Sequence, residues 1–146
     1  MTKSINLALV GASGVVGTKI IQLLEKKSLP IDNFYPLGNR SSGQTIEFNK
    51  AQHIINNIES FDPTIADLII FSAGSDVAKQ YARSYVAAGS YVIDLSSHYR
   101  YEDDVPLVIP EINSSALEAL NAPSLIANPN CSTSQLLMAL KPIHDE

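Results

Sequence analysis

The sequence predicts an α/β fold with a mainly parallel sheet and helices on both of its faces. Short apolar runs alternate with amphipathic helical segments along the chain, and a glycine-rich turn separates the first run from the first helix. The 146 residues are enough for one domain with its own core. Together these observations are typical of a doubly wound, Rossmann-like domain.

Apolar runs of three to six residues predict the buried strands of such a sheet. The first run leads directly into the glycine turn. Two weakly alternating stretches, 45–48 and 52–55, predict short additional strands. The full set of predicted strands is 5–10, 33–37, 45–48, 52–55, 68–71, 91–95, 107–109 and 125–127.

Apolar residues at helical spacing predict four helices between or after these strands. The first ends near Lys26 and Lys27, the second is closed by Gly89, a third runs through Leu120, and the last covers 132–140. Asn113 or Ser114 is the predicted N-cap of the third helix. The residues expected to face the core are Val15, Val16, Ile20, Leu23 and Leu24 in the first helix, and Val77, Ala78, Tyr81, Ala82, Tyr85 and Val86 in the second.

Composition excludes several classes of protein. The net charge is -5 and basic residues are scattered, which argues against a nucleic-acid footprint or an anionic membrane partner. A single cysteine cannot form an internal disulfide, and no apolar segment is long enough to span a membrane. We therefore expect a cytoplasmic protein without a bound metal.

The glycine turn predicts a dinucleotide site. Gly11, Gly14 and Gly17 lie between the first strand and first helix with the spacing G-x-x-G-x-x-G. Glycine permits a tight turn and close approach of a pyrophosphate, while the helix start offers unpaired N–H groups and a positive dipole. The Ser13 hydroxyl would add a donor. The alternative is a plain strand–helix turn in which the glycines serve packing alone.

The segment after the second strand indicates which nucleotide is bound. An NAD site usually has an acidic residue about 20 positions after the glycines, to hold the ribose 2′-hydroxyl. Here the sequence is "PLGNRSSG", in which Arg40, Ser41 and Ser42 would suit a 2′-phosphate. This favours NADP over NAD; the alternative is a polar turn with an exposed arginine.

Cys131 lies in "ANPNCSTSQ", between Asn130 and a helical segment. Asn130 is a good N-cap, so Cys131 falls in the first helical turn, where unpaired N–H groups favour a thiolate. The Asn130 side chain and the Cys131 N–H could form an oxyanion hole. A thiolate beside a nicotinamide suggests addition to an aldehyde, loss of hydride and a thioester. The alternative is a small buried hydrophobic residue.

Five segments occur in the order found in one known family: "GASGVVG", "GNRSSG", "FSAGSDVAKQYA", "VIDLSSHYRYEDDVPLVIPEIN" and "ANPNCSTSQL". Over nearly its whole length the chain resembles the NADP-binding N-terminal part of aspartate-β-semialdehyde dehydrogenase. Glyceraldehyde-3-phosphate dehydrogenase and N-acetyl-glutamyl-phosphate reductase share the chemical logic, but typically have other residues around the cysteine.

The resemblance implies reversible conversion of aspartyl phosphate and NADPH to aspartate semialdehyde, phosphate and NADP, in lysine, threonine and methionine biosynthesis. Cys131 would be the nucleophile and Asn130 its orienting partner. Arg100 would bind the substrate phosphate, unless it pairs with Glu102 or Asp103. The implied cofactor residues are Ser13, Gly14, Val15 and Val16 at the pyrophosphate, Arg40 and Ser41 at the 2′-phosphate, and Ser72, Ala73 and Gly74 along the cofactor.

Chains of this family are more than twice as long, and they form homodimers or homotetramers. Their second domain supplies the histidine base and the arginine that binds the substrate carboxylate. We therefore expect residues 1–146 to be an NAD(P)-binding domain, cut at a domain edge, that binds NADP without turnover. Two alternatives are a non-catalytic nucleotide sensor and a cysteine hydrolase that pairs Cys131 with His98.

Overall fold

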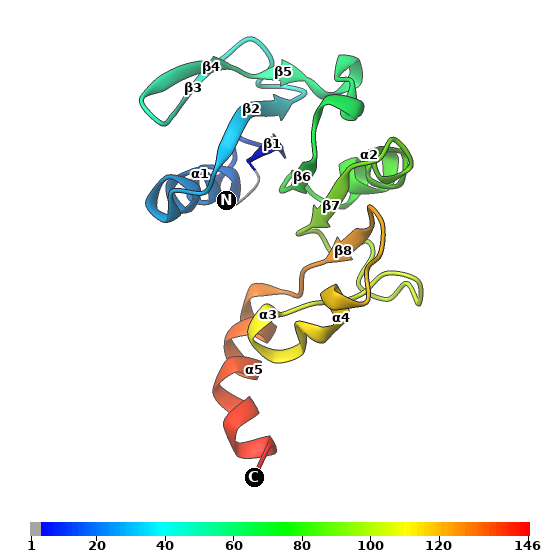
Figure 1. The fold of residues 1–146 in the computed structure, drawn as a ribbon. Coiled ribbons are helices and arrows are strands. Elements are labelled where there is room, and N and C mark those ends of the chain that lie inside the picture. Colours follow the sequence, from blue (N-terminus) through cyan, green and yellow to red (C-terminus); the bar gives the residue numbers. More distant parts are fainter. Residues whose placement is uncertain (1–3) are drawn as a thin grey trace.

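The computed structural model describes residues 4–146, whose centre is a six-stranded sheet in the order β5-β2-β1-β6-β7-β8 (Figure 1). Every pairing within this sheet is parallel. The fold is therefore the doubly wound arrangement that the sequence predicted. The strands are β1 (Ile5–Val10), β2 (Ile31–Gly38), β5 (Asn56–Asn57), β6 (Leu68–Phe71), β7 (Tyr91–Asp94) and β8 (Leu125–Ala127).

The remaining elements connect or flank these strands. β3 (Thr45–Phe48) and β4 (Ala51–Ile54) form a separate antiparallel hairpin, and two short 3₁₀ turns, η1 (Ile58–Ser60) and η2 (Pro63–Ile65), lead into β6. None of the helices within residues 4–146 has both the length and the apolar character needed to cross a membrane. The α-helices are α1 (Val15–Lys27), α2 (Ser75–Ala87), α3 (Pro110–Asn113), α4 (Ser115–Glu118) and α5 (Cys131–His144).

Alternating residues of the central strands form two cores, one on each face of the sheet. In β1, Leu7 and Leu9 belong to the core that includes Ile21 of α1, whereas Ala8 and Val10 belong to the core under α2. Accordingly, α1 and α2 lie on opposite sides of the sheet in Figure 1. Because both faces are covered, the four buried residues of β1, 7–10, are all apolar.

The apolar pattern predicted α2 better than α1. All six predicted residues of α2 belong to the core or pack against it. In α1, Ile20 and Leu24 pack against the core as predicted, but Val15, Val16 and Leu23 are 86%, 52% and 55% exposed. The prediction of one continuous apolar face was therefore wrong: only Ile20, Ile21 and Leu24 of this helix join the core on that face of the sheet.

Two predictions between β7 and β8 were also wrong. Residues 107–109 form no strand, and Leu107 makes only an isolated bridge to Ala127. The predicted helix from an N-cap at Asn113 or Ser114 through Leu120 is the shorter α4, whose N-cap is Ser114, and α3 before it was not predicted. Asn113 ends α3 instead of capping a longer helix: its Oδ1 accepts from the Ile109 N–H at 2.8 Å, and its Nδ2 donates to the Leu107 carbonyl at 2.9 Å.

Candidate active site

A cavity of about 580 Å³ opens where the carboxyl ends of β1 and β6 meet. These neighbouring strands are not consecutive in the chain, so this is the point where the sheet changes winding direction and where such folds bind ligands. The cavity brings together five of the predicted cofactor residues, from three separate loops: Gly11, Ser13, Arg40, Ser41 and Ala73.

The glycine turn has the close packing expected of a phosphate-binding loop. Gly11 has a φ of +81°, and an added Cβ would lie 3.0 Å from the backbone of Ser72. Gly17 is buried, and a Cβ there would collide with the Gly11 carbonyl oxygen. Gly14 is the N-cap of α1 and supplies no side-chain hydrogen bond. Consequently the first N–H groups of α1 have no acceptor among residues 4–146 and are available to an anion.

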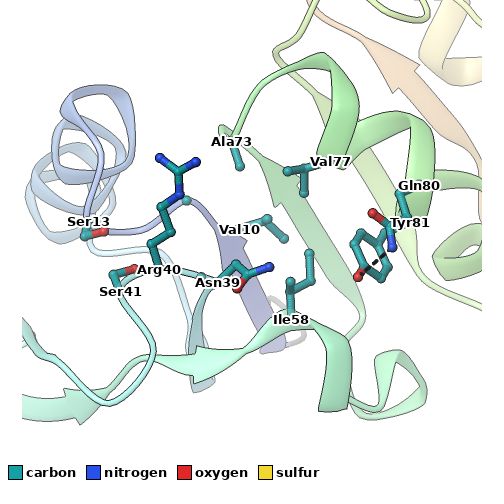
Figure 2. A pocket seen from close by; sticks show the side chains of 12 residues that line it. Val10, Ser13, Asn39, Arg40, Ser41, Ile58, Ala73, Val77, Gln80 and Tyr81 are labelled. Atoms are coloured by element: carbon teal, nitrogen blue, oxygen red, sulfur yellow. Dashed lines mark hydrogen bonds between the residues drawn. The ribbon is translucent and has the colours of Figure 1, made fainter.

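Arg40 lies at the start of a tight turn that follows β2. The Ser42 N–H donates to the Asn39 carbonyl at 3.2 Å and the Gln44 N–H to the Ser41 carbonyl at 3.1 Å. This turn leaves the Arg40 side chain exposed at the cavity, on the same side as Ser13 and Ser41 (Figure 2). A cation and hydroxyl groups beside a helix start form a site suited to phosphate oxygens.

The opposite side of the cavity was not predicted from the sequence. It is formed by Val77, Gln80 and Tyr81 of α2, together with Ile58 (Figure 2). The Gln80 side chain donates to the Tyr81 hydroxyl at 3.0 Å. Val77 and Tyr81 were assigned to the core on periodicity, and they do pack against it. That these two residues also line the cavity could not be predicted, because the same helical periodicity accounts for their packing against the core.

Several predicted cofactor residues lie outside this cavity lining. Ser72 is half-buried and donates to the Val10 carbonyl at 2.7 Å, which joins the end of β6 to β1. Gly74 has a φ of +91° and is the N-cap of α2. The others that do not line the cavity are Gly14, Val15, Val16, Gly17 and Ser42.

Cys131 is the first residue of α5 and is exposed. The Asn130 side-chain oxygen caps the helix by accepting from the Ser132 N–H at 2.9 Å, and the Cys131 Sγ lies 3.9 Å from that same oxygen. The alternative of a buried hydrophobic cysteine is therefore wrong. Within residues 4–146 the sulfur has no hydrogen bond to a histidine, and the His98 ring packs edge-on against Tyr99 at 4.5 Å.

Cys131 does not line the cavity, but both lie at the same edge of the sheet. The thiol follows β8, and the glycine turn follows β1, three strand spacings away. At ~4.8 Å per spacing the separation across the sheet is roughly 14 Å. A ligand that contacts both places must therefore be extended along the carboxyl edge.

Arg100 bridges the ends of β7 and β8. Its Nε donates to the Asn128 carbonyl and its Nη2 to the Leu95 carbonyl, both at 3.0 Å. The alternative that Arg100 pairs with Glu102 or Asp103 is wrong: no acidic side chain within residues 4–146 pairs with it. Two backbone carbonyls hold the half-buried cation at the edge that also carries Cys131.

Asp94 is a further polar residue at this edge that the sequence analysis did not identify. It ends β7, is fully buried, and accepts from both the N–H and the hydroxyl of Ser96 at 2.9 and 2.7 Å. The tripeptide Asp94–Leu95–Ser96 has the D-x-S pattern of a local side-chain turn, which is the signal that could have revealed it. This turn fixes the direction in which the chain leaves the strand.

The comparisons agree with this geometry. Residues 6–120 match the family model described as semialdehyde dehydrogenase, NAD binding domain. The aspartate-semialdehyde dehydrogenases of Shewanella sp. (strain DB6705) and Legionella pneumophila are 46% and 45% identical to the chain, over 99% of its length. The chain covers 43% and 42% of those relatives, so it spans less than half of their length.

A solved structure gives the same picture. The crystal structure of aspartate semialdehyde dehydrogenase II complexed with ASA from Vibrio cholerae matches with a TM-score of 0.94 and 41% identity. The match covers 98% of this chain and 47% of that one. The family match spans most of the chain, and it agrees with the glycine turn and the cavity at the β1–β6 junction. The chain therefore belongs to the semialdehyde dehydrogenase family, as a pyridine-nucleotide-binding domain that resembles the N-terminal part of aspartate-semialdehyde dehydrogenases.

Proposed function

We propose that residues 1–146 are the NADP-binding domain of an enzyme that interconverts aspartyl phosphate and aspartate semialdehyde, with Cys131 as its nucleophile. The observation that carries the proposal is that one sheet edge presents a glycine turn, the Arg40 cation beside it and an exposed thiol at a helix start. Relatives named as aspartate-semialdehyde dehydrogenases, of which the chain covers less than half, support aspartate semialdehyde as the aldehyde.

The residues at the cavity fit a phosphorylated dinucleotide. The unpaired N–H groups at the start of α1 would bind the pyrophosphate, because they combine free donors with the positive end of the helix dipole. Arg40 and Ser41 would hold the 2′-phosphate, and Val77 and Tyr81 would supply an apolar wall. Within residues 4–146 no acidic side chain lines the cavity to accept a ribose 2′-hydroxyl, which favours NADP over NAD.

Cys131 would perform the covalent step. In the oxidative direction its thiolate adds to the aldehyde carbon, and the Cys131 N–H at the helix start stabilises the resulting oxyanion. When bound, NADP supplies the acceptor for the hydride that then leaves this carbon. A thioester remains on Cys131, inorganic phosphate attacks its carbonyl carbon, and the carbon–sulfur bond breaks. The products are the acyl phosphate and the free thiol.

Arg100 would receive that phosphate. Two of its five N–H donors are used by the Leu95 and Asn128 carbonyls, and the other three have no acceptor within residues 4–146. Asn128 is three residues before Cys131, so the cation is tied to the segment that carries the nucleophile. A fixed, always-charged guanidinium suits both binding of phosphate and stabilisation of its attack.

A binding titration tests the cofactor assignment. The purified chain should bind NADPH more tightly than NADH, and Arg40→Ala should weaken NADPH about tenfold while leaving NADH unchanged, since a charge-assisted phosphate contact is lost. Lys27→Ala, which removes an exposed cation at the far end of α1, is the matched control. Equal affinity for the two nucleotides in the wild-type chain would overturn the assignment of Arg40.

A second assay tests the proposal that this chain binds NADP without turnover. The resemblance implies that the histidine base and the carboxylate-binding arginine belong to the second domain of the family, and the chain spans less than half of the length of its relatives. We expect no semialdehyde-dependent NADPH formation by the purified 146-residue chain, even at protein concentrations high enough for slow turnover to be detected. Steady turnover that Cys131→Ser abolishes would contradict this part of the proposal.

A further inference from the structure

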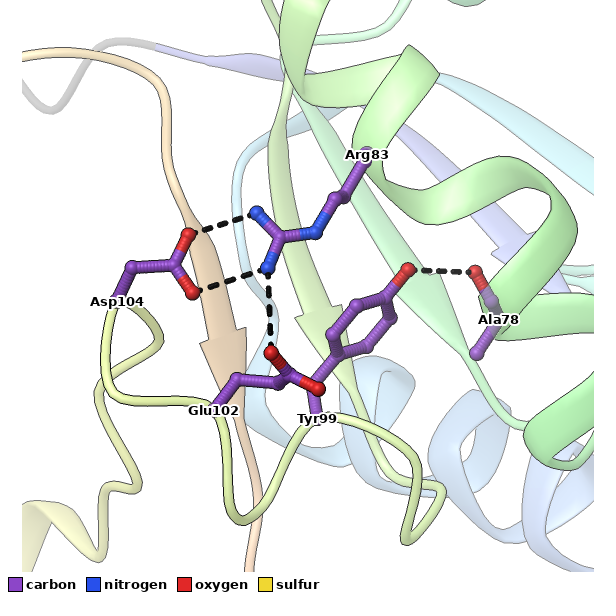
Figure 3. A network of polar contacts seen from close by, with 5 residues as sticks. All are labelled: Ala78, Arg83, Tyr99, Glu102 and Asp104. Atoms are coloured by element: carbon purple, nitrogen blue, oxygen red, sulfur yellow. Dashed lines mark hydrogen bonds and ion pairs between the residues drawn. The ribbon is translucent and has the colours of Figure 1, made fainter.

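The loop that carries Arg100 is attached along α2 at three points. Near its start the Ser97 hydroxyl lies 3.1 Å from the Ser75 hydroxyl, in the first turn of the helix. At its middle the buried Tyr99 hydroxyl donates to the Ala78 carbonyl at 3.3 Å. Near its end Asp104 binds Arg83 (Figure 3). The three attachments follow the helix from its N-terminus toward its C-terminal half.

The Arg83 contact is the most directional of the three. Its two terminal nitrogens donate to the two Asp104 carboxylate oxygens at 2.8 and 3.0 Å, and its guanidinium lies 5.3 Å from the centre of the Tyr99 ring. A carboxylate oxygen of Glu102 lies 4.0 Å from the Nη2 atom of Arg83. The hydrogen bonds to Arg83 lower the pKa of Asp104, so its carboxylate is charged throughout the neutral range.

This pairing is better suited to fixing geometry than to stabilising the domain. The Arg83 and Asp104 side chains are 51% and 63% exposed. Exposed ion pairs contribute little to folding because water and salt screen them. A bidentate guanidinium–carboxylate pair nevertheless restricts the relative orientation of its partners. Together with the ring of Tyr99, it holds the loop on both sides of Arg100.

We propose that Arg83 is a positioning residue: by holding Asp104 and Tyr99 on α2, it keeps Arg100 directed at the sheet edge that also carries Cys131. The inference rests on the proposed role of Arg100 in binding phosphate. The other side of α2 lines the dinucleotide cavity through Val77 and Tyr81. The same helix therefore supports the cofactor site and the loop that carries the phosphate-binding cation.

Two NMR measurements on the 146-residue chain test this inference. The first is hydrogen exchange of the Arg100 Nε–H, which is bound to the Asn128 carbonyl and needs no ligand. Arg83→Gln and Asp104→Asn should each accelerate this exchange about fivefold, in keeping with loss of one exposed bidentate pair. Exchange of the Leu9 backbone N–H in the central strand should stay constant, which separates loss of positioning from loss of global stability.

The second measurement is titration with inorganic phosphate, followed by the same Arg100 signal. Arg83→Gln should raise the Kd for phosphate about fivefold and leave the Kd for NADPH within twofold of wild type. Arg83→Lys should give an intermediate value, because lysine keeps the charge but loses the bidentate geometry. Exchanging the partners, Arg83→Asp with Asp104→Arg, should restore most of the wild-type affinity.

Asp103→Asn is the matched control, because it removes the same charge from the same loop at a residue that does not contact Arg83. Unchanged Arg100 exchange in both Arg83→Gln and Asp104→Asn would overturn the inference, and so would equal acceleration by Asp103→Asn. If the Arg100 signal of the wild-type chain does not change on addition of phosphate, the proposed phosphate-binding role of Arg100 is refuted. The exchange measurement would still decide whether Arg83 positions Arg100.

Discussion

Gly17, in the first turns of α1, packs directly against the carbonyl oxygen of Gly11, the residue that follows β1. No side chain fits between them. This contact sets the direction in which α1 leaves the sheet, and with it the position of the N–H groups proposed to bind the pyrophosphate. The third glycine of the motif is thus required for helix–strand packing, and the first for its positive φ.

Gly17→Ala should destabilise the domain strongly. The added methyl group collides with the Gly11 carbonyl oxygen, and backbone cannot move aside as a flexible side chain can. We expect a loss of about 3 kcal/mol in the free energy of unfolding, the upper range for overpacking. Urea denaturation followed by circular dichroism measures it. Gly14→Ala is the control, since its Cβ would lie 3.2 Å from the same oxygen and needs only a small adjustment; equal losses would contradict the packing role.

Replacement of Asn130 should separate its capping role from its proposed catalytic one. Asn130→Ala removes the acceptor for the Ser132 N–H and should cost about 1 kcal/mol of stability. Asn130→Ser restores an acceptor for the cap but lacks the side-chain amide. Its stability should therefore return to the wild-type value, while acylation of Cys131 remains slower than in the wild type. Thermal unfolding and acylation by a reactive ester follow the two effects. A wild-type acylation rate in Asn130→Ser would show that Asn130 only caps the helix, and would contradict its proposed catalytic role.

Tyr85 should make the domain sensitive to alkali. Burial raises the pKa of its hydroxyl to about 12, and that hydroxyl donates to the Ile58 carbonyl at 3.1 Å. An unfolded tyrosine has a pKa of about 10, so its contribution to stability is complete below pH ~10 and is lost as the pH rises toward 12. The shift corresponds to a loss of about 2–3 kcal/mol over that range.

Tyr85→Phe should flatten this part of the stability–pH profile, measured by urea denaturation at a series of alkaline pH values. At neutral pH the variant should be about 1 kcal/mol less stable, because the Ile58 carbonyl loses its donor. Tyr101, which is 94% exposed, provides the matched control: Tyr101→Phe should leave the profile unchanged. A Tyr85→Phe profile with the wild-type slope would show that another group causes the alkaline loss.

Much of the fold could be predicted because its local signals agree. The bounds of β1, β3, β6 and β8 were predicted correctly, since apolar or alternating runs end there at glycine or polar residues. β5 was missed because Asn56 and Asn57 are polar, and they pair with β2 through backbone groups that any residue has. Between β7 and β8, α3 was missed and α4 was predicted two residues too long, because propensity does not show that Asn113 turns back to bind Leu107.

The site also has parts that could be predicted from local sequence and parts that could not. Gly11, Arg40 and Cys131 lie in short motifs, and each motif carries its own chemical signal in the sequence. Arg100 is held by carbonyl groups of Leu95 and Asn128, which are brought together only by the pairing of β7 with β8. Contacts of that kind depend on tertiary structure, so no local pattern could have predicted them.

We propose that a dinucleotide bound at Arg40 extends along the sheet edge to Cys131. The most direct test is the rate of Cys131 alkylation, measured by mass spectrometry with and without saturating NADPH. We predict that saturating NADPH slows alkylation of Cys131 in the wild-type chain at least fivefold. In the Arg40→Ala variant, the same NADPH concentration should slow alkylation less. An alkylation rate that does not change while a parallel titration shows the site to be saturated would contradict the claim.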